Sequence, residues 1–157
     1  MGDNMKRFFA VLCAITMFIP SLAIFPTSAC ELPQIQKSTH YPDGSYIITV
    51  ISEEDTFSPQ LFTSYTKNGS KTTTAYSATG NVLYSLTVHG TFSYDGTSAY
   101  AIRSAYSYTD ESPLWTFTSG SSSCSSACAT ALGTFKAGSI SKSVSVSLTC
   151  SANGTLS

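Results

Sequence analysis

The chain has 157 residues, with 8 basic and 9 acidic side chains and a formal net charge of −1. Only 11% of its residues are charged, against roughly a quarter in ordinary soluble domains, so the surface is expected to be rich in hydroxyls rather than ions. This balance excludes a strongly basic nucleic-acid binder, because neutralising phosphates requires clustered Lys and Arg. The length fits one folded domain.

Residues 1–29 have the pattern of a removable signal peptide. Lys6 and Arg7 provide the positive start, residues 8–19 form an apolar run, and small residues stand directly before Cys30. We therefore predict a secreted, extracellular protein that has no membrane contact after cleavage.

Two alternatives for this leader remain open. The 18 apolar-rich residues 8–25 are just long enough to span a membrane as a retained anchor. Cys30 also stands where a lipoprotein carries its lipid, which would make the protein a cell-surface lipoprotein. The start codon is either Met1 or Met5.

Residues 30–44 are polar, contain two prolines and show no periodicity, which predicts an extended N-terminal arm. Residues 45–157 are predicted to form a single β-domain. Its expected strands lie at 45–51, 61–66, 71–78, 82–94, 97–109, 114–118, 125–136 and 139–150.

Turn signals separate most of these segments. Asp43-Gly44 and Asp95-Gly96 predict tight turns, and Asn68-Gly69 predicts a further hairpin. The serine-rich segment 119–126 is expected to be a loop, because it is too polar to pack. Gly90 interrupts an apolar row and predicts a bulge or bend.

Apolar residues alternate with polar, mostly hydroxyl, residues over most of 82–94 and again over most of 139–150. A period of two is useful only to a pleated strand with one buried face. The fold class predicted is all-β, an antiparallel β-sandwich (immunoglobulin-like) or an open barrel, of about seven to nine strands.

Of the five cysteines, Cys30, Cys124, Cys128 and Cys150 would remain after cleavage. An oxidising compartment favours a disulfide over a metal site. A hairpin turning at 137–138 would place Cys124 opposite Cys150, so this pair is the first choice. Cys128–Cys150 and Cys124–Cys128 are the alternatives.

The sequence offers little catalytic chemistry. His40 and His89 are the two bases available, no nucleophile elbow accompanies the serines, and the acidic clusters 53–55 and 110–111 lie in expected turns. Phosphate-binding and calcium-binding loop patterns are missing. We therefore predict no catalytic residue, no cofactor and no metal ligand, and a protein that is not an enzyme.

Amphipathic aromatics are the candidate binding residues, since they contact sugars or proteins at low entropic cost. The alternative interpretation places them in the core and its rim. The candidates are Tyr100, Tyr106, Tyr108 and Trp115, and the three tyrosines are predicted to share one face of a strand.

Two segments, GTFSYDG at 90–96 and SVSVSLTCSANGTLS at 143–157, carry a resemblance. The chain resembles small secreted proteins of Gram-positive gut bacteria with a GTFxYDG hairpin and a C-terminal VxLTCSxxGxLS motif, a family without an assigned function. The resemblance implies secretion and a β-fold, and no activity. We expect a non-enzymatic binding or interaction module for a cell-wall glycan or surface protein; the alternative is a small secreted toxin or bacteriocin-like protein.

Overall fold

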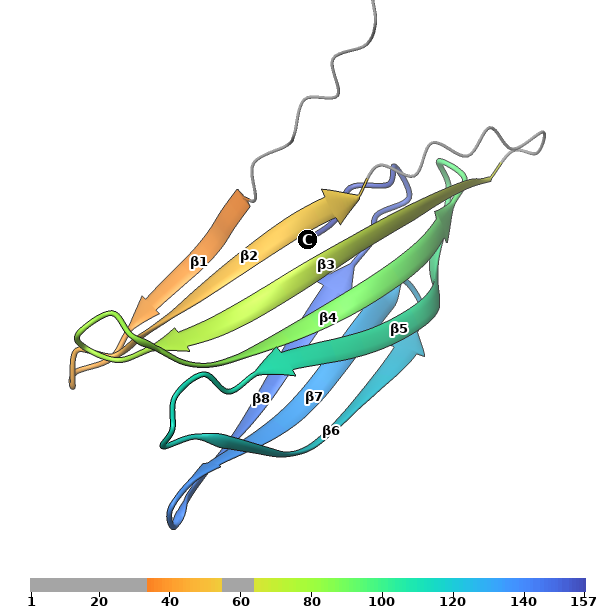
Figure 1. Ribbon diagram of the computed structural model, residues 1–157. Coiled ribbons are helices and arrows are strands. Elements are labelled where there is room, and N and C mark those ends of the chain that lie inside the picture. The colour runs from red at the N-terminus through yellow and green to blue at the C-terminus, as the bar shows by residue number, and fades with distance from the viewer. Residues whose placement is uncertain (1–33, 55–63) are drawn as a thin grey trace, which may run out of the picture.

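A computed structural model describes residues 34–54 and 64–157, which form eight β-strands (Figure 1). The predicted signal peptide and Cys30 lie outside the described residues. The strands are β1 Gln34–His40, β2 Tyr46–Glu54, β3 Tyr65–Tyr76, β4 Val82–Tyr94, β5 Ala99–Thr109, β6 Thr116–Ser125, β7 Cys128–Ala137 and β8 Ile140–Thr149.

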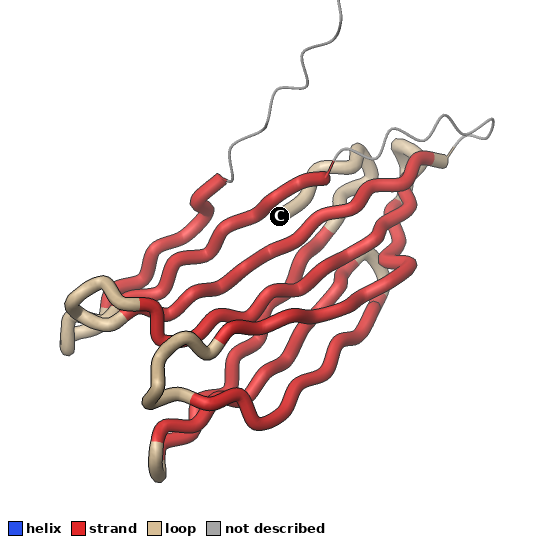
Figure 2. The backbone as a smooth tube through the Cα atoms, viewed as in Figure 1, coloured by secondary structure: helices blue, strands red, loops and turns tan. Residues whose placement is uncertain are grey.

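The strands form two antiparallel sheets, one of β1–β5 and one of β6–β8, that pack against each other (Figure 2). The predicted all-β sandwich is therefore confirmed. Within each sheet the spatial order follows the chain, which differs from the Greek-key connections of immunoglobulin domains. The smaller sheet lies under β3, β4 and β5, so that β1 and β2 extend beyond it (Figure 1).

The core lies between the sheets and follows the predicted alternation. The apolar side chains of β4 turn inward and meet those of β7 and β8. Small side chains on β7 let the two sheets pack close together. Aromatic rings fill one end of the core, where the rings of Tyr84 and Phe135 stack with their centroids 4.4 Å apart. The side chains with the lowest exposure are Leu86, Val88, Phe92, Ala129, Ala131, Phe135 and Leu148.

Two predicted turns are confirmed, at Gly44 (φ 81°) and at Gly96 (φ 84°). Both glycines adopt the left-handed conformation that a side chain disfavours. In the second turn the carboxylate of Asp95 accepts hydrogen bonds from the backbone N–H groups of Thr97 (2.9 Å) and Ser98 (2.7 Å). The aspartate thus closes the turn that the glycine permits.

The hairpin predicted at Asn68-Gly69 is wrong, because β3 runs through these residues without a turn. Gly69 lies opposite Gly90 in the ladder between β3 and β4. A Cβ atom at Gly69 would collide with Leu156. The glycine therefore serves the close packing of the C-terminal segment against the sheet rather than a reversal of the chain.

Two further segments predicted as irregular are edge strands. Residues 119–125, predicted as a loop, belong to β6 and pair with β7. Residues 34–40, predicted as part of an arm, form β1 and pair with β2. Edge strands tolerate polar sequences because one flank and one face meet water, so the absence of apolar alternation misled both predictions.

A β-bulge in β5 decides which side chains face the core. Thr91 pairs with Arg103 and Phe92 with Ala101, so Ile102 is the additional residue. A bulge resets the alternation of side chains along the strand. The bulge residue lies on β5, opposite the step from Thr91 to Phe92 on β4. The bulge or bend that the sequence predicted at Gly90 is therefore found on the neighbouring strand instead.

Candidate functional site

The outer face of the five-stranded sheet, which points away from β6–β8, is covered by hydroxyl side chains in paired positions. Thr72 and Thr87 lie 2.8 Å apart at their Oγ1 atoms, and Ser85 Oγ lies 2.8 Å from Thr109 Oγ1. These hydroxyls satisfy one another across neighbouring strands, which leaves a flat and uncharged surface over the middle of the sheet.

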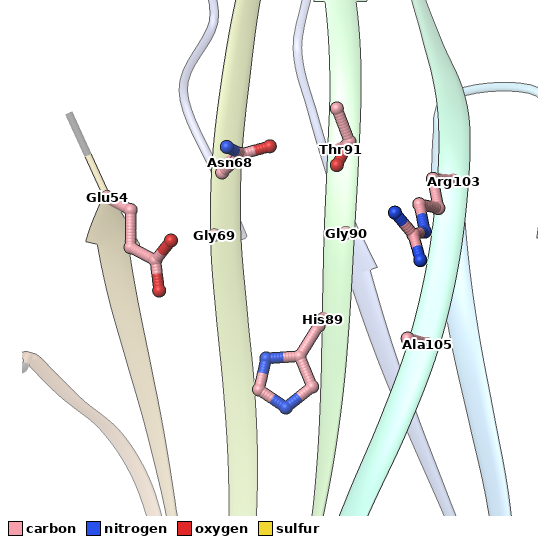
Figure 3. Close-up of a pocket in the computed structure, with 8 residues that line it drawn as sticks. All are labelled: Glu54, Asn68, Gly69, His89, Gly90, Thr91, Arg103 and Ala105. Atoms are coloured by element: carbon pink, nitrogen blue, oxygen red, sulfur yellow. The ribbon is translucent and has the colours of Figure 1, made fainter. Parts of the chain in front are cut away.

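One end of this outer face carries a shallow pocket of about 220 Å³ (Figure 3). Four strands contribute to it, from β2 to β5. Its lining residues are Glu54, Asn68, Gly69, His89, Gly90, Thr91, Arg103 and Ala105. We call this the outer pocket.

Four polar side chains cross the outer pocket in one row. Glu54 pairs with Asn68, Asn68 with Thr91, and Thr91 with Arg103, each on the neighbouring strand. Adjacent strands lie about 4.8 Å apart, so the backbone positions of Glu54 and Arg103, the two ends of the row, lie about 14 Å apart. It presents a negative end, a positive end, and an amide and a hydroxyl between them (Figure 3).

The bulge in β5 places Arg103 in this row. By simple alternation Arg103 would share the inward direction of Ala101, which packs against the core. The extra residue at Ile102 turns Arg103 to the outer face instead. The pocket's only cationic group among its lining residues therefore depends on an irregularity that the sequence pattern did not reveal.

Backbone forms the floor of the outer pocket between this row and the next row of outward-facing side chains, which includes His89. Gly69 and Gly90 lie side by side there, and space on their core side is already filled, since a Cβ at Gly90 would lie 2.5 Å from Phe92 Cε2. In the next row His89 is exposed and its Nε2 lies 2.9 Å from Ser107 Oγ, in line with the polar position predicted for this histidine.

The four candidate aromatics do not lie on one face, because the bulge separates Tyr100 from the others. Tyr100 pairs with Ser93 on the outer face and is 61% exposed, next to the row that contains Arg103. Tyr108 stacks on Phe117 with ring centroids 3.7 Å apart. Tyr106 and Trp115 are partly buried and pack against the core.

The predicted Cys124–Cys150 disulfide is not present: the three described cysteines, Cys124, Cys128 and Cys150, are free thiols. Cys124 belongs to β6 and pairs with Ala129 of β7, whereas Cys150 follows β8. Two strand spacings of about 4.8 Å separate β6 from β8, beyond the Cα separation of about 7 Å that a disulfide spans. The predicted register was also wrong, since Cys128 faces Thr149.

The other candidates for chemistry are dispersed. Glu53 forms an ion pair with Lys67 on the inner face of the sheet, so it points away from Glu54. The carboxylate of Asp110 accepts a hydrogen bond from the backbone N–H of Phe117 (3.2 Å). His40 stacks on Tyr46 at a ring distance of 5.3 Å, far along the sheet from His89. Asp55 lies outside the described residues.

Within the described ranges, no three His, Cys, Asp or Glu side chains are grouped as a metal site would require. The same part of the chain contains no helix with the length and hydropathy needed to cross a bilayer. Comparisons with protein-family models, with curated proteins and with solved structures find no match to this chain.

Proposed function

We propose that the protein is a secreted, non-enzymatic binding module that recognises a carbohydrate at the outer pocket. The observation that carries this proposal is the row of Glu54, Asn68, Thr91 and Arg103 across four adjacent strands. Such a row combines donors and acceptors at regular intervals, and sugars present hydroxyls that act as both.

The surroundings of the pocket support this ligand class. Tyr100 is exposed on the same face beside the row, and an aromatic ring next to polar groups suits the apolar face of a sugar. The pocket is open and built on rigid strands, so it accommodates a polymer without a conformational change.

The placement of the carboxylates supports binding without turnover. Glycoside hydrolysis uses two carboxyl groups that flank one bond, about 5–10 Å apart. Glu53 and Glu54 are neighbours in sequence but lie on opposite faces of β2, and Glu53 is already paired with Lys67.

The test is co-sedimentation of the full chain with insoluble chitin, cellulose and purified peptidoglycan. We expect one of these to retain the protein, and Arg103→Ala or Asn68→Ala to weaken retention by about tenfold or more. Lys136→Ala is the matched control, because Lys136 is exposed on β7 in the other sheet.

Retention that is the same in Arg103→Ala as in the unaltered chain would place the ligand elsewhere and contradict the proposal. Inhibition of bacterial growth by the protein without retention on any of the three polymers would favour the toxin alternative. Release of soluble sugars that is lost in His89→Ala would contradict the non-enzymatic assignment.

A further inference from the structure

A second groove lies on the inner side of the sandwich, where the two sheets differ in width. The larger sheet has five strands and the smaller has three, and β8 packs beneath β3 and β4. The strands β1 and β2 therefore extend past β8 as a roof (Figure 1). The space under this roof is the position that a fourth strand of the smaller sheet would occupy.

The groove has a volume of about 430 Å³. Its roof comes from β1, β2 and β3 and its wall from β8. The lining residues are Lys37, Thr49, Lys71, Thr73, Ser145, Val146 and Ser147. We call this the edge groove.

The edge groove is positively charged. Lys37 and Lys71 are its two charged residues, and neither forms an ion pair with another residue that the structure describes. Glu53, an acid on the inner face of β2, is paired with Lys67. The roof hydroxyls Thr49 and Thr73 bond to each other at 3.3 Å, which leaves two ammonium groups to attract an anion.

The wall of the groove is an unpaired strand edge. Thr149 exchanges two backbone hydrogen bonds of 2.9 Å with Ser157 on the side away from β7. Backbone groups alternate in direction along a strand, so Ser147 and Ser145 present their N–H and C=O groups on that same side. No described strand pairs with them there.

We propose that an extended acidic segment of a partner protein binds in the edge groove as a fourth strand of the β6–β8 sheet. Addition of a strand to a free edge supplies backbone hydrogen bonds, and alternate side chains then determine specificity. Lys71 pairs with Ile51, two residues along β2 from Thr49, which pairs with Lys37. The two lysines are thus offset by about 6.6 Å along the strands and by two strand spacings of about 4.8 Å across the sheet. Alternate side chains of an added strand face this roof, so Asp or Glu at every second position faces the lysines.

This site is separate from the outer pocket. The edge groove lies on the inner face of the larger sheet, whereas Arg103 and Asn68 lie on the outer face. A peptide is favoured over an anionic polysaccharide because the free edge offers paired backbone donors and acceptors, which only another strand matches along its length.

The test measures binding of a synthetic Thr-Glu repeat peptide to the full chain by fluorescence anisotropy. We expect it to bind, and a Thr-Lys repeat peptide not to bind. Lys71→Glu is expected to weaken binding by about tenfold or more. Lys136→Glu is the matched control, because it makes the same charge change on β7 outside the groove, and Arg103→Ala leaves peptide binding unchanged.

Strand addition is tested by Ser145→Pro, which removes an edge-facing N–H without removing a bond to β7. We expect this variant to lose peptide binding and Ser145→Ala to retain it. Amide hydrogen exchange provides a second measurement that needs no variant: the peptide should slow exchange at Ser145 and Ser147.

Three results would overturn the proposal. They are unchanged exchange at Ser145 and Ser147 when the peptide is bound, tighter binding of polygalacturonate than of the Thr-Glu peptide, and dimers of the protein in sedimentation that the peptide does not disperse. The last two would assign the groove to a polysaccharide or to a second copy of the chain.

Discussion

Gly69 and Gly90 lie directly opposite each other on β3 and β4, and each allows a core side chain to rest against the sheet. Leu156 occupies the space at Gly69, and the ring of Phe92 covers Gly90. The glycine pair therefore has two roles. On the core side it leaves room for the C-terminal segment to pack, and on the outer side it forms the floor of the outer pocket.

Gly90→Ala should destabilise the protein by overpacking. The added methyl would lie 2.5 Å from Phe92 Cε2 and 3.2 Å from Ala129 Cβ, so both sheets must shift. We expect a loss of about 1–3 kcal/mol in the free energy of unfolding, measured by urea denaturation. Ser93→Ala on the same strand is the control, and equal losses in the two variants would show that the close contact is not limiting.

Phe135→Ala should produce the largest loss of stability among single core variants of the smaller sheet. Phe135 is fully buried and its ring contacts Tyr84 and Phe117. Removing it leaves a cavity, which costs about 3–5 kcal/mol. Leu132→Ala, on the same strand but 51% exposed, should change the free energy of unfolding by less than about 1 kcal/mol. Similar losses in the two variants would mean that Phe135 is not at the centre of the interface between the two sheets.

The turn at Asp95 predicts that the free energy of unfolding falls at acidic pH. Backbone N–H groups of Ser98 and Thr97 bond to the carboxylate and hold the pKa of Asp95 below its ordinary value. The folded state therefore favours the charged form, so the stabilisation is complete above the unfolded pKa of about 3.9 and is lost as pH falls through the lower folded pKa.

Asp95→Asn removes this titration. Urea denaturation at a series of acidic pH values should show a smaller decrease in stability for Asp95→Asn than for the unaltered chain. The same reasoning applies to Asp43, whose pKa is lowered first by the hydroxyl and then by the N–H of Ser45. Parallel acid profiles in Asp95→Asn, in Asp43→Asn and in the unaltered chain would contradict this account of the turns.

The cysteines should differ in reactivity. Burial raises the pKa of the Cys150 thiol, and the thiolate is the form that reacts with alkylating agents. Cys124 is exposed, so iodoacetamide should modify Cys124 first and Cys150 only on unfolding. Peptide mass spectrometry identifies the order. A chain that resists alkylation at Cys124 and Cys150 together until it is reduced would instead restore the disulfide that the sequence predicted.

Prediction from sequence succeeded where one physical signal dominated. Strand β4 has the bounds Val82–Tyr94 that its alternation predicted, because one face is buried under β7 and β8 and the other meets solvent. It failed where context overrode local preference. Asn68-Gly69 is a strong hairpin signal, yet neighbours on both sides of β3 hold these residues in a straight ladder.

The outer pocket was the least predictable feature. His89 was assigned to a polar strand position from its parity, but the position of Arg103 depends on one bulge residue, Ile102. The alternation of residue types along β5 does not show where a bulge lies, so Tyr100 and Tyr106 were predicted to share a face. The edge groove depends on the unequal widths of two sheets, and strand patterns alone do not determine how sheets overlap.

Every ladder between the eight described strands joins strands that are consecutive along the chain. Loop closure is therefore short for each pairing, and each sheet can zip up hairpin by hairpin with its own local contacts. Among the described residues, contacts between strands far apart in sequence form when the two sheets dock. Phe92 of the larger sheet and Ala129 of the smaller sheet come together in one core only at this last step of assembly. The speed of folding should therefore depend on docking rather than on the formation of any strand pair.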